Sequence, residues 1–240
     1  MRAGQLPLDL RLRDASRFET FHAGSHGLLV ATLRNMARAS GPGNEQQVFL
    51  HGAEGCGKTH LLQAVCHEAS LRDRSCAYLP LAELADRDPA RVLEDMSRLD
   101  LLALDDLQAV AGELHWARAL FDLVNRVRER DGQLLFAARS TPDGLACGLP
   151  DLVSRLGWGP VFRIDQPGDL ELKAILRKRA GLRGLELGDA VAEYLLRHEC
   201  RDLEFLLALL DRLDLAALAE QRRLTIPFIR AHLRARPAER

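Results

Sequence analysis

The chain has 240 residues, 47% of them hydrophobic, which is enough for one substantial core or for a medium domain with a small second one. Its 34 acidic and 33 basic side chains leave a formal net charge of −1, which excludes a protein-wide field that would attract DNA or an anionic membrane. There is no signal-peptide-like start, no apolar run of membrane-spanning length, and no pattern among the five cysteines that suits a zinc ion or a disulfide framework, so we expect a cytoplasmic protein with reduced thiols and no membrane contact.

Apolar runs alternate with amphipathic segments along the first two thirds of the chain. A short helix over 28–36 and a polar loop over 39–47 come first. Strands are then expected at 48–50, 77–81, 99–104, 134–138 and 161–164, and helices at 59–69, 90–96 and 114–130. This order is typical of a parallel sheet with helices on both faces, and it predicts a five-stranded α/β domain.

After Gln166-Pro167-Gly168 the sequence shows helical periodicity alone, with helices expected at 170–179, 189–198, 203–219 and 226–233. This change predicts a small all-helical second domain that is joined to the first by a hinge at Pro167-Gly168. We therefore expect an N-terminal arm over 1–20, a nucleotide-binding α/β domain over 21–167 and a helical lid domain over 168–240.

A phosphate-binding loop is predicted between the first strand and the helix that follows it. The string Gly52-Ala53-Glu54-Gly55-Cys56-Gly57-Lys58-Thr59 matches the Walker A pattern in the context that its mechanism requires, after an apolar strand and at the start of an amphipathic helix. Backbone N–H groups would surround the phosphates, the lysine would reach the terminal phosphates, and the threonine would ligate Mg²⁺. The alternative is a glycine-rich turn without a ligand. The candidate nucleotide-binding residues here are Gly52, Gly55, Cys56, Gly57, Lys58, Thr59 and His60.

Two carboxylates follow the third expected strand, at Asp105 and Asp106. The sequence predicts a Walker B element, in which Asp105 organises a magnesium ion together with Thr59. Asp106 stands where many AAA+ enzymes carry a glutamate that polarises the attacking water, so it is the candidate catalytic carboxylate. Since aspartate is one methylene shorter, we expect slow intrinsic ATP hydrolysis. The alternative for either residue is a turn or a helix cap after a buried strand.

Three motifs together resemble one family. They are Gly57-Lys58-Thr59-His60-Leu61-Leu62, the Asp105-Asp106 pair, and Leu149-Pro150-Asp151-Leu152-Val153-Ser154-Arg155-Leu156-Gly157-Trp158-Gly159. They are similar to the DnaA-related AAA+ proteins, which include the bacterial replication initiator DnaA and its shorter relative Hda. The resemblance runs from about Gln5 to Leu233, and it implies a P-loop AAA+ fold with a helical lid, bound ADP or ATP with Mg²⁺, and a role in DNA replication.

Two features favour the Hda branch of this family. DnaA continues past its lid into a helix-turn-helix DNA-binding domain, whereas this chain ends shortly after the helix that begins at Ile226. The hexapeptide Gln5-Leu6-Pro7-Leu8-Asp9-Leu10 also resembles the sliding-clamp-binding motif of Hda. Its side chains Gln5, Leu6, Leu8 and Leu10 would fill a polar pocket and an apolar groove on the clamp. The alternative is an apolar strand that packs on its own domain.

Three arginines carry over from the same resemblance. Arg155 matches the arginine finger that stabilises charge on a neighbouring subunit's γ-phosphate, and its alternative is a solvated surface arginine. Arg201 matches the sensor 2 position that touches the nucleotide in cis, with Arg197 as a nearby alternative register. Arg139 falls where the family often has a polar sensor 1 residue, commonly aspartate, and this departure makes efficient hydrolysis in cis less expected.

The resemblance implies a negative regulator of replication initiation. Tethered to the DNA-loaded sliding clamp, it would present Arg155 to ATP on DnaA and convert DnaA to its ADP form, contacting DNA only through the clamp. One alternative is a homo-oligomeric AAA+ motor or helicase loader that hydrolyses its own ATP. Another is a nucleotide-gated clamp adaptor without a catalytic role.

Overall fold

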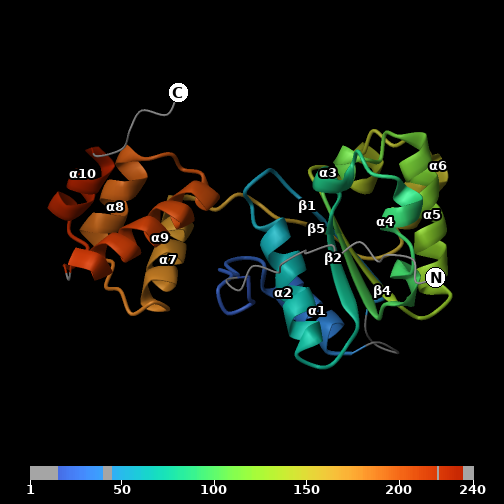
Figure 1. Cartoon of the computed structure of the whole chain (residues 1–240), viewed down its shortest axis with the longest axis horizontal. Helices are drawn as coiled ribbons and strands as arrows, with labels where there is room; N and C mark the ends of the chain where they lie inside the picture. The colour runs from blue at the N-terminus through green and yellow to red at the C-terminus, as the bar shows by residue number, and fades with distance from the viewer. Residues whose placement is uncertain (1–15, 40–44, 221, 235–240) are drawn as a thin grey trace, which may run out of the picture. The chain divides into compact units, whose positions relative to one another are not determined.

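The computed structural model describes residues 16–39, 45–220 and 222–234. It divides into two compact units, of which the first ends at Asp165 and the second begins at Gln166, and each unit is described by itself (Figure 1). In the described part of the chain, no helix combines the length and the apolar character needed to cross a membrane.

The first unit contains the predicted five-stranded parallel sheet. Its strands are β1 (Gln47–His51), β2 (Cys76–Pro80), β3 (Leu101–Asp105), β4 (Gln133–Ala138) and β5 (Val161–Arg163). They lie in the order β2-β3-β4-β1-β5, and every neighbouring pair is parallel. Because all strands run the same way, the loops that follow β1, β3 and β4 emerge at one edge of the sheet, where ligands bind in folds of this class.

Helices cover both faces of this sheet. They are α1 (Gly27–Arg38), α2 (Lys58–Ser70), α3 (Leu81–Leu84), α4 (Pro89–Val92), α5 (Leu114–Arg128) and α6 (Pro150–Leu156), with single 3₁₀ turns η1 (Met96–Arg98), η2 (Leu107–Ala109) and η3 (Pro142–Gly144). Successive strand residues alternate between two cores: Leu102 and Leu104 pack on the α5 side, while Leu101 and Ala103 pack on the side of α1 and α2. The sheet is therefore buried on both faces, which explains why its strands read as continuous apolar runs.

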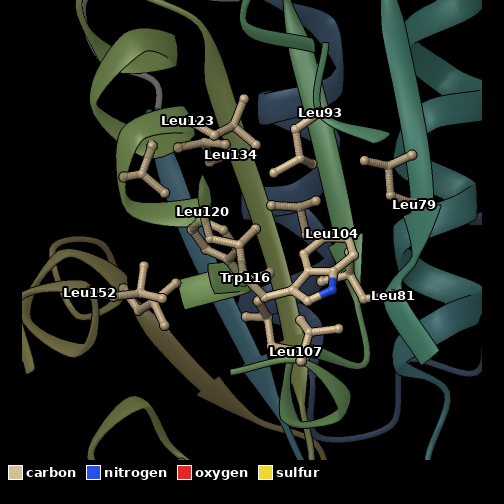
Figure 2. Packing of buried hydrophobic residues seen from close by; sticks show 14 of the residues in the cluster. Leu79, Leu81, Leu93, Leu104, Leu107, Trp116, Leu120, Leu123, Leu134 and Leu152 are labelled. Atoms are coloured by element: carbon tan, nitrogen blue, oxygen red, sulfur yellow. The ribbon is translucent and has the colours of Figure 1, made fainter. Parts of the chain in front are cut away.

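The core on the α5 side is the larger of the two in the first unit. Figure 2 shows Trp116, Leu120 and Leu123 of α5 packed towards Leu104 and Leu134 of the sheet. Trp116 is fully buried, and its indole N–H donates to the carbonyl of Ala85 at 3.1 Å. This cluster fixes α5 on the sheet, and α5 in turn supplies Phe121 and Asn125, which contact Arg155 as described below.

One expected helix is shorter in the structure. Residues 90–96 were expected to form a single helix, but α4 ends at Val92, and Asp95 adopts the left-handed conformation with φ 61° before the 3₁₀ turn at Met96. The prediction of one continuous helix is therefore wrong. A left-handed residue cannot continue a right-handed helix, and aspartate tolerates this conformation better than most side chains.

The second unit is all-helical, as predicted. It consists of α7 (Asp169–Gly181), α8 (Asp189–His198), α9 (Leu203–Glu220) and α10 (Ile226–Arg234). One apolar cluster joins all four helices, with Leu176, Leu195, Leu210 and Ile229 among its buried members. The fold of the chain is thus a parallel α/β unit followed by a small helical unit, which confirms the fold class predicted from the sequence.

Candidate functional site

The phosphate loop joins β1 to α2 and depends on its glycines. A Cβ atom at Gly52 would lie 2.2 Å from the carbonyl oxygen of Ile164, so no other residue fits this close approach. Gly57 precedes the first residue of α2 and has φ 102°, a left-handed conformation that glycine adopts without strain. The loop therefore has the backbone geometry of a phosphate cradle, with the N–H groups of the first turn of α2 at its end.

Lys58 is folded over this loop. Its Nζ donates to the carbonyl oxygens of Gly52 at 2.8 Å and Ala53 at 2.7 Å, and the residue is only 6% exposed. Because these two partners are neutral carbonyls, a phosphate bound at the loop would supply a counter-charge for the Lys58 ammonium. At the end of β1, burial and the charge of Arg163 lower the pKa of His51, so the imidazole is neutral at physiological pH.

Thr59 and Asp105 form the expected magnesium pair. The Thr59 hydroxyl donates to Asp105 Oδ2 at 2.6 Å, and the Tyr78 hydroxyl donates to the same oxygen at 3.0 Å. Burial raises the pKa of Asp105, and burial likewise raises the pKa of Tyr78, which keeps the phenol protonated as a donor. A hydroxyl and a carboxylate are hard oxygen ligands, and they fit an Mg²⁺ ion that shares its remaining positions with water and phosphate oxygens.

A cage of three or more His, Cys, Asp or Glu side chains is absent from the described ranges. The hydroxyl and carboxylate of Thr59 and Asp105 suit a metal ion that arrives with a phosphate group.

Asp106 is held by a neighbour that sequence reasoning missed. It has φ 55°, and its Oδ1 accepts a hydrogen bond from Gln108 Nε2 at 2.7 Å. The other end of the Gln108 amide accepts from the backbone N–H of Arg139 at 3.1 Å. Gln108 thus connects the residue after β3 with the residue after β4, and its amide orientation is fixed from both ends.

Arg139 faces the phosphate loop from the end of β4. Its Nη2 lies 2.9 Å from Glu54 Oε2, and both side chains are largely exposed. The sequence places Arg139 at the sensor 1 position only by alignment, and the structure adds Glu54 as its partner. No signal in the sequence pairs these two residues, which are 85 positions apart.

The side chains of His60 and Cys56 contact other parts of the first unit: His60 lies against the N-terminal segment, and Cys56 lies beside Lys58. The imidazole Nε2 of His60 lies 2.9 Å from the carbonyl oxygen of Arg17 and 3.2 Å from Thr20 Oγ1. Phe18 is also buried beside α1 and α2, so residues 16–20 of the expected arm pack on the first unit. Cys56 is buried with its sulfur 3.6 Å from Lys58 Nζ. His60 therefore ties the N-terminal segment to α2, close to the loop.

Arg155 lies near the end of α6, on a platform built from several elements. Its guanidinium carbon is 3.9 Å from the centroid of the Trp158 ring and 5.4 Å from that of Phe121, and its Nε donates to Asn125 Oδ1 at 3.1 Å. Arg128 contacts the same Trp158 ring at 4.2 Å. Stacking and a fixed hydrogen bond hold the guanidinium in one orientation at a partly exposed position.

The platform is also tied to the strand that precedes the phosphate loop. Gln47, the first residue of β1, donates from its side-chain amide to the carbonyl oxygens of Arg155 at 2.8 Å and Leu156 at 2.9 Å. These bonds satisfy the carbonyls at the end of α6, and they fix the position of this short helix on the sheet.

The remaining candidate residues lie outside the first unit or outside the described ranges. Arg201 belongs to the second unit, where its Nη2 lies 3.5 Å from Asp169 Oδ2, and Arg197 pairs there with Glu193 at 2.8 Å. A role of Arg201 towards nucleotide stays a prediction. The expected clamp-binding residues Gln5, Leu6, Leu8 and Leu10 lie outside the described residues.

Comparison with known proteins identifies both units. Residues 12–163 match the family described as the bacterial DnaA ATPase domain, and residues 169–233 match the lid domain of Hda. Domain III of DnaA from Thermotoga maritima has a similar structure, with a TM-score of 0.76, 23% identity, and coverage of 93% of this chain and 98% of that one.

Two further solved structures share the fold. A replication initiator DnaA bound to AMPPCP and single-stranded DNA has a TM-score of 0.69 at 26% identity, over 83% of this chain and 66% of that one. The RuvB Holliday junction branch migration motor of Thermotoga maritima has a TM-score of 0.62 at 19% identity, over 88% and 66% of the two chains, and this likeness shows the fold alone. Because the DnaA ATPase-domain match spans more than half of the sequence and the lid match is to Hda, the chain belongs to the DnaA-related AAA+ family and carries a lid of the Hda type.

Proposed function

We propose that this protein binds an adenine nucleotide, ADP or ATP, with Mg²⁺ at the phosphate loop. The close-packed glycines, the buried ammonium of Lys58 and the oxygen pair of Thr59 and Asp105 support this proposal. A DnaA structure that contains AMPPCP, 26% identical to this chain, supports the adenine base and the triphosphate. When Mg²⁺ is bound, it supplies charge neutralisation at the β- and γ-phosphates.

The function that the site supports best is regulation of replication initiation, in which Arg155 is presented to ATP on DnaA and stimulates its hydrolysis there. The observation that carries this proposal is the held guanidinium of Arg155. Stacking on Trp158 and the bond to Asn125 orient it before any partner arrives. A pre-oriented guanidinium stabilises the charge that develops on a transferring phosphoryl group without losing side-chain freedom at that moment.

We further propose that the N-terminal segment tethers the protein to the DNA polymerase III sliding clamp through Gln5, Leu6, Leu8 and Leu10. The protein would then be held near DNA through the clamp and would make no contact with DNA itself. This part of the proposal is supported by the sequence motif alone.

The Arg155→Ala variant tests the regulatory proposal. Purified chain, ATP-loaded DnaA and DNA-loaded clamp are mixed, and phosphate release is followed over time. An arginine finger accelerates phosphoryl transfer by roughly 10³-fold or more, so the variant should lose nearly all stimulation while its nucleotide affinity is unchanged. Arg91→Ala is the matched control, because Arg91 is an exposed arginine paired with Asp88 on the same unit.

Two outcomes would contradict this proposal and favour one of the alternative functions. Full stimulation by the Arg155→Ala variant would contradict the finger and favour a nucleotide-gated clamp adaptor. Hydrolysis by this chain alone that rises with its own concentration would instead favour the self-oligomerising motor or helicase loader.

The tether is tested separately by replacing Gln5, Leu6 and Leu8 with alanine together. We expect this triple variant to lose clamp binding in size-exclusion chromatography and to keep the thermal stability and nucleotide affinity of the parent, because an N-terminal arm contributes little to a core. Co-elution of the triple variant with the clamp would show that the contact lies elsewhere on the chain.

A further inference from the structure

Two cysteine side chains meet between helix α2 and strand β2. The thiol of Cys76, the first residue of β2, donates to the carbonyl oxygen of Cys66 at 3.3 Å. The thiol of Cys66, on α2, donates to the carbonyl oxygen of Ala77 at 3.7 Å. Each sulfur therefore lies against the backbone of the element that carries the other one. Cys66 is 1% exposed, whereas Cys76 is half-buried on the edge strand of the sheet, so the pair has an inner and an outer thiol.

The surroundings make the two thiols chemically unequal. The Cys66 thiol donates to the sulfur of ionised Cys76, and this hydrogen bond lowers the pKa of Cys76 to about 7. Ser70 and Arg74 lower the pKa of Cys76 further, while burial and Asp100 oppose the shift. The same hydrogen bond and burial raise the pKa of Cys66 well above its usual value. Near pH 7.5 the outer thiol is therefore largely a nucleophilic thiolate, and the inner thiol keeps its proton.

We propose that hydrogen peroxide oxidises Cys66 and Cys76 to an intramolecular disulfide that joins α2 to β2. In the first step the Cys76 thiolate attacks one peroxide oxygen, the O–O bond breaks, and the leaving hydroxide takes a proton from solvent to form water. In the second step the Cys66 sulfur attacks the sulfur of the Cys76 sulfenic acid, the S–O bond breaks, and the leaving hydroxide takes the Cys66 proton. The two thiols lose two electrons and two protons, and the peroxide becomes two molecules of water.

The contact between the two side chains supplies the approach that the second step needs. A sulfenic acid beside a thiol condenses with it, and this reaction protects the sulfur from further, irreversible oxidation. Cys147 offers a comparison within the same unit, because it is also half-buried but donates to the carbonyl oxygen of Leu149, two positions along its own loop, at 3.4 Å. We therefore expect Cys147 to remain outside the disulfide.

The disulfide would lie away from the phosphate loop. Cys76 pairs with Leu101 at the amino ends of β2 and β3, whereas the phosphate loop follows the carboxyl end of β1. The new bond would close a ring over ten positions around the turn from α2 to β2. Closing such a ring restricts the unfolded chain, so oxidation should raise the melting temperature of the first unit on the order of 5 °C and leave nucleotide affinity unchanged. The inference is thus independent of the proposed function.

Peptide mapping of the full chain tests the disulfide directly. The protein is treated with hydrogen peroxide at pH 7.5, alkylated in denaturant, and recovered from the monomer band of a non-reducing gel. Trypsin separates the two cysteines into peptides 59–72 and 75–87. We expect these two peptides to appear joined, with the loss of two of the chain's five thiols, and to separate after treatment with dithiothreitol. Cys147→Ser is the matched control and should form the same joined pair.

Two variants and dimedone, a reagent that traps sulfenic acids, test the order of the steps. Cys66→Ser removes the thiol that closes the bond, so peptide 75–87 should gain a dimedone adduct that the parent lacks. Cys76→Ser should give no adduct on peptide 59–72, because Cys66 is buried. Peroxide treatment of the parent that leaves both peptides reduced, or that oxidises Cys76 without joining it to Cys66, would overturn the proposal. An oxidised parent that melts below the reduced one would also contradict it.

Discussion

Replacing Lys58 by alanine removes the cation that the phosphate loop holds. In the parent, Lys58 Nζ donates to two loop carbonyls at 2.8 Å and 2.7 Å and is 6% exposed, so its loss also weakens the nucleotide-free loop. The informative quantity is therefore not the melting temperature of the variant but the rise in melting temperature that each protein shows when nucleotide is added. We expect a clear rise in the parent and almost none in Lys58→Ala.

The size of the effect follows from linkage. A ligand at 100 times its Kd stabilises the native state by about 2.7 kcal/mol. For a unit that extends to Asp165, roughly 1 kcal/mol corresponds to about 2–4 °C, so saturating ADP with Mg²⁺ should raise the melting temperature of the parent by about 5–11 °C. Lys58→Ala should shift by less than about 1 °C.

Differential scanning fluorimetry with and without ADP measures both shifts on the same day and in the same buffer. Lys173→Ala is the control, because Lys173 belongs to the helical unit and pairs with Glu193 at 3.8 Å. Equal shifts in the parent and in Lys58→Ala would refute the assignment of this lysine to the phosphates.

Two further predictions use pKa shifts. Burial raises the pKa of Asp105 in the folded protein. Ionisation of this carboxyl therefore destabilises the folded protein at a pH above the folded pKa. Below the unfolded pKa of about 3.9 the carboxyl is protonated in both the folded and the unfolded protein, and the destabilisation disappears. Asp105→Asn should therefore melt higher than the nucleotide-free parent at pH 7.5, with a gap that narrows on acidification, and a lower melting temperature at pH 7.5 would contradict this reasoning. The hydrogen bond from Cys66 lowers the pKa of Cys76 to about 7. The rate of Cys76 alkylation by iodoacetamide, followed by peptide mass spectrometry, should therefore rise with pH with a midpoint near pH 7. Cys66→Ala should shift this midpoint to higher pH. A midpoint near the ordinary thiol value of 9.0 in the parent would rule out the hydrogen bond between Cys66 and Cys76.

The fold could be predicted because its signals are local. Each strand is an apolar run, each covering helix has one apolar stripe, and the phosphate loop stands between a strand and a helix. Side chains at i and i+1 of a doubly covered strand are both buried, so β3 and β4 form continuous apolar runs that are easily found. The ends of elements were less certain: the strand expected at 99–104 is Leu101–Asp105, and Asp95 interrupts the helix expected at 90–96.

The partners of the site residues could not be predicted in the same way. Tyr78 lies 27 positions from Asp105, and Asn125 lies 30 positions from Arg155, so these contacts arise only once the strand order and the packing of α5 on the sheet are known. One signal was present for Tyr78, since it is a hydroxyl-bearing residue within an otherwise apolar strand. Gln108 is two positions from Asp106, but nothing in its surroundings marks it as a hydrogen-bond donor to that carboxylate.

The contact between Trp158 and Arg155 gives the protein an optical reporter. The chain contains two tryptophans: Trp116 is sealed in the core, and Trp158 is 45% exposed with two guanidinium groups against its ring. In a Trp116→Phe background, the tryptophan emission would come from Trp158 alone. Arrival of a partner at Arg155 would change the polarity and the cationic surroundings of that indole, so the proposed docking could be followed in real time without any attached dye.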